Sequence, residues 1–117
     1  MLRMSDLSIL EERKTVLELL GEYESILTPK QREVMNDYYR FDLSLSEIAE
    51  SSGVTRAAIH DMIAKTVAKM NEFEAKLHLV EKKKDIKSAI SAIEKVEDAN
   101  MKLELYRQLG KDLTDGI

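Results

Sequence analysis

Hydrophobic residues recur along the chain at intervals of three and four positions, the period of a helix with one buried face. From about Ser5 to Ile26, the apolar residues Leu10, Leu17 and Leu20 follow this period between acidic side chains. No segment alternates apolar and polar residues in the way that predicts a strand bounded by hairpin turns. With four glycines and one proline, the chain is predicted to be all-α with short connections.

Capping residues mark where the next two helices begin. Thr28 and Gln31 have the spacing of a capping box, in which each side chain bonds a backbone amide of the other residue. Ser44 and Glu47 repeat this spacing, which predicts a short helix over residues 45–51.

A tight turn separates this short helix from the next one. Gly53 tolerates the left-handed backbone that ends a helix, and Thr55 can cap the helix that follows. Ala49 is small enough for the two helices to touch. The positions expected to face the core are apolar: Ile48, Val54, Ile59 and Met62. Together these features predict a helix-turn-helix.

The start of the second helix of this motif is where such proteins contact base edges and phosphates. The candidate nucleic-acid-binding residues are Thr55, Arg56, Ala57, His60, Asp61 and Lys65. Alanine and aspartate are poor groups for this task, and the sequence pI is about 5.3, whereas domains that bind nucleic acid often exceed ~9. Two alternatives therefore stand: the motif binds nucleic acid, or it serves packing and protein contact.

The helix that begins at Arg56 is predicted to run to about Lys84, because no residue in between would stop it. Its apolar positions follow one another at intervals of 4, 3, 4, 3, 4 and 3, a heptad seam. The seam consists of Ile59, Ile63, Thr66, Met70, Phe73, Leu77 and Val80. Either the later helices of the same chain cover it, or two copies pair along it, and we expect a homodimer through this C-terminal half.

Charge is distributed unevenly along the chain. Residues 1–54 hold 6 basic and 11 acidic groups, and residues 55–84 hold 7 basic and 4 acidic groups. The densest basic cluster is Lys82 to Lys84, which is either a solvated surface or a phosphate contact. No cysteine is present and no apolar stretch approaches the ~18 residues of a membrane span, so we expect a soluble, cytoplasmic protein without a membrane partner.

Catalytic motifs are missing from the sequence. His60 and His78 stand 18 residues apart, which is not a metal-ligand spacing. There is no phosphate-binding glycine loop and no cysteine nucleophile. We therefore expect a protein that is not an enzyme and that holds no metal or cofactor.

Two family resemblances follow from these motifs. The stretch "LTPKQREVMNDYYRFDLSLSEIAESSGVTRAAI" resembles the C-terminal promoter-reading region of bacterial sigma factors. A longer resemblance, over about two thirds of the chain, is to the YlxM family of small bacterial proteins. The shared elements are the pair Tyr38 and Tyr39, the helix "SLSEIAE", residues 53–56, Asp61, and the triplet at residues 76–78.

The YlxM resemblance implies an all-helical, sigma-like helix-turn-helix protein that is dimeric and is linked to the signal recognition particle (SRP) by the neighbourhood of its genes. It implies an accessory or regulatory protein of that pathway, binding SRP RNA or DNA. The alternatives are an adaptor that binds the SRP GTPase subunit or receptor, and a DNA-binding transcriptional regulator. We expect a single domain over residues 1–117, with three helices in 1–54, the extended recognition helix in 55–84 and further helices in 85–117.

Overall fold

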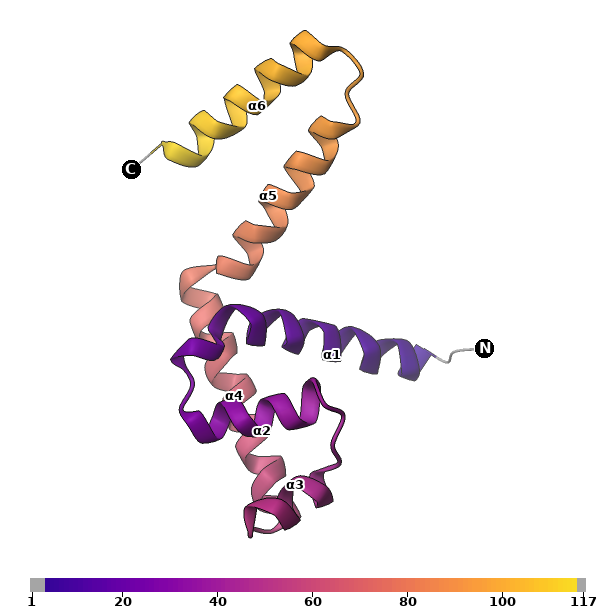
Figure 1. Cartoon of the computed structure of the whole chain (residues 1–117), viewed down its shortest axis with the longest axis vertical. Helices are drawn as coiled ribbons and strands as arrows, with labels where there is room; N and C mark the ends of the chain where they lie inside the picture. The colour runs from indigo at the N-terminus through magenta and orange to yellow at the C-terminus, as the bar shows by residue number, and fades with distance from the viewer. Residues whose placement is uncertain (1–3, 116–117) are drawn as a thin grey trace. The chain divides into compact units, whose positions relative to one another are not determined.

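The computed structural model describes the backbone of residues 4–115 and the side chains of residues 8–115. This part of the chain is helical and contains no strand, which confirms the all-α prediction (Figure 1). The elements are α1 (Met4–Tyr23), a 3-10 turn (Glu24–Ile26), α2 (Pro29–Tyr39), α3 (Leu45–Ser52), α4 (Arg56–Leu77), α5 (Leu79–Glu94) and α6 (Ala99–Thr114).

The predicted caps form as the sequence indicates. The side chain of Thr28 accepts a hydrogen bond from the amide of Gln31, whose side chain bonds back to the Thr28 amide. Ser44 and Glu47 make the same reciprocal pair at the start of α3. Each such cap satisfies two amides that the first turn of a helix leaves without an intrahelical partner.

The core of residues 1–80 lies where α1, α2 and α3 meet α4. Its members from the first three helices include Leu20, Tyr23, Met35 and Ile48, each at most 1% exposed. From α4 come the seam residues Ile59, Ile63, Thr66 and Met70, which are also buried. The first three helices thus cover this part of the seam, so neither the later helices nor a second copy is its occupant.

The predicted continuation of α4 to Lys84 is wrong. The helix ends at Leu77, and His78 takes a left-handed conformation with φ of 54° before α5 begins. The buried hydroxyl of Tyr23 donates to the carboxylate of Glu74 at 2.5 Å, and the same oxygen accepts the amide of Val80 at 2.9 Å. That amide is therefore bonded by a side chain instead of by the helical carbonyl four residues back.

The lower part of the seam is only partly buried. Phe73 packs at 6.0 Å from the ring of Tyr23, and Val80 packs against the core. Leu77, however, is 45% exposed. The seam is therefore interrupted at Leu77, where α4 ends, although Val80 of α5 still contacts the core.

By its internal contacts the chain divides into two compact units, residues 1–80 and residues 81–117. In the second unit Ile93 is buried, while α6 exposes several large apolar side chains: Met101, Leu103, Leu105, Tyr106 and Leu113. The single-domain assignment of residues 1–117 stays a prediction. Among the described helices, none is long and apolar enough to cross a membrane.

Candidate nucleic-acid interface

The helix-turn-helix is built from α3, a short turn and α4. Gly53 ends α3 with φ of 69°, a conformation that side-chain-bearing residues rarely adopt, and its amide bonds the carbonyls of Ala49 and Glu50. The amide of Val54 then bonds the carbonyl of Ala49 at 3.1 Å. Ala49 itself is 5% exposed. Val54 was predicted as a core position, but it is 46% exposed, because the turn directs this residue to the solvent.

The start of α4 is capped by Thr55, whose hydroxyl accepts the amide of Ala58 at 3.1 Å. All six candidate residues of the predicted interface are exposed: Thr55, Arg56, Ala57, His60, Asp61 and Lys65. Residues four apart share one face of a helix, so Arg56 lies beside His60, and Ala57, Asp61 and Lys65 follow one another in a continuous strip. The structure therefore brings the candidates together on one solvent-facing surface at the beginning of α4.

Charge on this strip is partly cancelled. The ammonium of Lys65 lies 3.0 Å from the carboxylate of Asp61, and both side chains are well exposed. An exposed pair of this kind contributes only ~0.2–1 kcal/mol to stability, but it places a negative charge beside the cation. Arg56 is thus the cation at the start of α4 that no carboxylate of the described residues offsets by an ion pair.

A further cation lies beside the turn and was missed by the sequence reasoning. The ammonium of Lys30, in the first turn of α2, donates to the hydroxyl of Ser52, the last residue of α3, at 3.0 Å. Lys30 also lies 3.7 Å from Glu33. Its place after Pro29 at a helix start gave no signal, because only the fold brings α2 to the end of α3. Lys30 and Ser52 extend the candidate interface from α4 onto α2 and α3.

Known proteins resemble this chain over most of its length. The model of the family UPF0122, described as "helix-turn-helix protein, YlxM / p13 like", matches residues 10–112. The chain belongs to this family. The match confirms the resemblance seen in the motifs, and it covers described residues of both compact units.

Individual relatives of the YlxM-like family support the assignment. A UPF0122 protein of Clostridium acetobutylicum is 41% identical over 112 residues, which cover 89% of this chain and 96% of the relative. A UPF0122 protein of Fusobacterium nucleatum is 42% identical over 82 residues, covering 70% and 80%. One from Shouchella clausii is 40% identical over 91 residues, covering 78% and 84%. The similarity therefore includes the helix-turn-helix and much of its surroundings.

Proposed function

We propose that this YlxM-like protein is a non-enzymatic accessory protein that binds nucleic acid through the start of α4. The observation that carries the proposal is the exposed strip at the start of α4, fixed by the capped turn that precedes it. In helix-turn-helix proteins this position enters the major groove or approaches a phosphate. Arg56 offers a bidentate donor for phosphate or guanine, and Thr55 and His60 offer single hydrogen bonds.

The proposed affinity is modest, and it depends on salt less steeply than that of a strongly basic reader. Arg56, Lys30 and Lys65 are the cations on or beside the strip, and Asp61 offsets the last of them. If Arg56 and Lys30 each neutralise one phosphate while Lys65 stays paired with Asp61, log K falls with log salt with a slope of about −1.8. Between 50 and 200 mM salt this slope lowers the affinity about 12-fold, less than the loss of a strongly basic reader.

The pathway and ligand are the finer part of the proposal. The resemblance to the YlxM family supports a regulatory role in the SRP pathway, with SRP RNA or an operator DNA as the ligand. A conventional transcriptional regulator would carry more cations on the reading helix than this strip does. We therefore place SRP RNA ahead of an operator.

The acidic first half of the chain favours a second candidate function. Residues 1–54 carry a net charge of −5. Such a surface repels phosphate and attracts basic protein partners. In this alternative the protein is an adaptor for the SRP GTPase subunit or receptor, and the helix-turn-helix serves as a scaffold.

The second compact unit supports a homodimer. It contains 37 residues and no cysteine, and folded units below about 40 residues usually need a disulfide, a metal or a partner chain. Residues 81–117 hold 8 basic and 8 acidic groups, so two identical units would not repel each other. We propose that the exposed apolar residues of α6, such as Met101 and Leu105, are covered by a second copy.

The test of the proposed function is a binding series at 50 and 200 mM salt. The purified protein is titrated with SRP RNA, a random DNA duplex and the SRP GTPase subunit. The proposal expects salt-sensitive binding to one of the nucleic acids that Arg56→Ala weakens and Arg107→Ala, an exposed arginine of the other unit, does not. Binding to the GTPase subunit alone, unaffected by Arg56→Ala, would establish the adaptor instead.

A further inference from the structure

An open groove lies between α1, the end of α2 and α4, within the first compact unit. It encloses about 360 Å³, at the lower end of the ~300–1,000 Å³ typical of binding sites. Its apolar lining includes Val16 of α1 and Ile63 and Val67 of α4. The rings of Tyr38 and Tyr39 line it as well.

A smaller hollow of about 170 Å³ continues this groove along α1. The two hollows share Glu12, Tyr38 and Tyr39, and the smaller one adds Ile9, which is 62% exposed. We call the two hollows together the α1 groove. Because it follows a helix over about two turns, from Ile9 to Val16, its length suits an extended or helical segment better than a compact small molecule.

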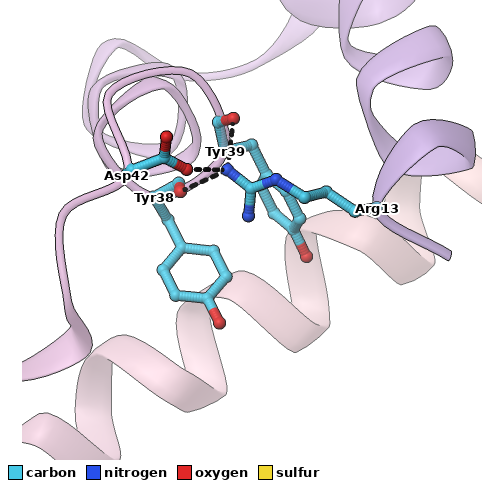
Figure 2. Close-up of polar contacts among 4 residues, drawn as sticks. All are labelled: Arg13, Tyr38, Tyr39 and Asp42. Atoms are coloured by element: carbon cyan, nitrogen blue, oxygen red, sulfur yellow. Dashed lines mark hydrogen bonds and ion pairs between the residues drawn. The ribbon is translucent and has the colours of Figure 1, made fainter. Parts of the chain in front are cut away.

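The tyrosine wall of the α1 groove is held in place by Arg13 (Figure 2). The guanidinium of Arg13 donates to the carbonyls of Tyr38 at 3.3 Å and Tyr39 at 2.7 Å and also contacts the carboxylate of Asp42. It lies 5.5 Å from the centre of the Tyr39 ring, and the two tyrosine rings meet edge to face at 5.0 Å. These contacts hold the tyrosine wall in place, and the positive charge of Arg13 is paired with the carboxylate of Asp42.

Glu12 gives the α1 groove its net charge. Its exposed carboxylate lines both hollows and makes no ion pair with any residue that the structure describes. Burial, the neighbouring Tyr38 and the Glu12 charge all raise the pKa of Tyr39. The lining also contains Arg13, which is paired with Asp42, and His60. The groove thus combines an apolar floor with a negative rim.

We propose that the α1 groove binds a basic amphipathic helix of a partner protein. Apolar side chains three or four residues apart would fill the space above Val16, Ile63 and Val67, as in other helix-in-groove complexes. A lysine or arginine of the same helix would pair with Glu12. The negative rim disfavours the phosphates of a nucleic acid. The α1 groove and the proposed interface at the start of α4 share His60, but Glu12 and the apolar floor belong to the groove alone, so this proposal does not depend on the proposed function.

The test uses two designed helical peptides with the same leucine positions, one with lysines at its polar positions and one with glutamates. Each is added to the full-length, ¹⁵N-labelled protein, and amide chemical shifts are recorded by NMR. The proposal expects the lysine peptide to move the amides of residues around the groove, such as Glu12, Tyr39 and Val67. It expects the glutamate peptide to bind at least about tenfold more weakly, since like charges oppose each other at the rim.

Two pairs of variants make the test specific. Glu12→Lys is expected to weaken the lysine peptide about tenfold, whereas Glu11→Lys, an exposed neighbour outside the lining, leaves its affinity unchanged. Ala64→Trp fills the groove and is expected to abolish binding, whereas Ala68→Trp, one turn further along α4 and outside the lining, does not. Thermal melts of all four variants verify that they are folded.

Three results would overturn the proposal. The first is equal binding of the two peptides, or shifts by the lysine peptide that avoid the groove. The second is movement of the amides of Glu12, Val16 or Tyr39, which line the groove outside α4, by a DNA duplex or SRP RNA. The third is dimer formation that Ala64→Trp abolishes, which would make a second copy the occupant.

Discussion

At the scale of single residues, the start of α4 is defined by how few cations it presents. Arg56 is the first residue of α4. The ammonium of Lys65 forms an ion pair with the carboxylate of Asp61 at 3.0 Å. Nucleic-acid affinity comes mostly from neutralised phosphates, so each added or removed charge on this strip has a measurable effect.

Removal of the aspartate charge tests this view. Asp61→Asn is expected to raise the affinity for the bound nucleic acid about three- to tenfold at 50 mM salt and to steepen the salt slope by about 1, because Lys65 then faces the phosphates alone. Fluorescence anisotropy with labelled RNA and DNA measures both quantities. Asp85→Asn, an exposed aspartate of the other unit, is the control. Equal affinities of Asp61→Asn and the unchanged protein would place the ligand elsewhere.

The buried Tyr23 hydroxyl gives a prediction about stability and pH. Burial and the hydrogen bond to Glu74 raise the pKa of Tyr23 above its usual 10.0. The folded state therefore keeps a proton that the unfolded state loses above pH 10, so this contribution to stability is full below pH 10 and is lost as the pH rises further.

Tyr23→Phe is expected to lower the free energy of unfolding by about 1–3 kcal/mol near pH 7, because the Glu74 carboxylate loses a bonded donor. It is also expected to flatten the fall in stability above pH 10. Urea titrations at several pH values measure this. Tyr106→Phe, at a tyrosine 37% exposed, is the control. The same slope above pH 10 in both variants would rule out this role for Tyr23.

At the scale of the helices, local sequence signals correctly predicted where α2 and α3 begin and where α3 ends. The capping boxes at Thr28 and Ser44 and the left-handed Gly53 all form as predicted. The break at His78 could not be predicted, because the Glu74 carboxylate that accepts the Val80 amide there is also bonded by Tyr23, which lies 51 residues earlier in the sequence. The candidate strip on α4 could be read from helical period, whereas Lys30 joined it only through folding.

Two glycines give opposite predictions at this scale. Gly53→Ala is expected to destabilise the protein by about 1 kcal/mol, because an alanine meets no atom there but must adopt a positive φ. Gly21→Ala, inside α1 with open space around it, is expected to stabilise by up to about 1 kcal/mol through helix propensity. Thermal unfolding of both variants measures the difference. Effects of the same sign would contradict this account of the turn.

At the scale of the whole molecule, charge separates the two compact units. Residues 81–117 are neutral, so the net charge of −4 resides in residues 1–80, which also carry the helix-turn-helix and the α1 groove. The homodimer expected from the heptad seam needs a different surface, since α1 to α3 cover most of that seam. We propose that the exposed apolar side chains of α6 form this surface.

Light scattering tests the dimer directly. At micromolar concentration the protein is expected to show twice the 13.4 kDa chain mass. Leu105→Glu is expected to yield the monomer, because a charge would be buried against the second copy. Ile26→Glu, an exposed apolar position of the first unit, leaves the dimer intact. A mass of one chain for the unchanged protein would exclude the dimer.

The exposed start of α4 is the surface proposed to bind nucleic acid. NMR mapping of amide shifts in the ¹⁵N-labelled protein, as SRP RNA or a random DNA duplex is added, tests this directly. We expect the largest shifts on residues 55–65, with smaller ones at Lys30 and Ser52. Shifts confined to the cluster Lys82 to Lys84, or no shifts with either nucleic acid, would contradict it.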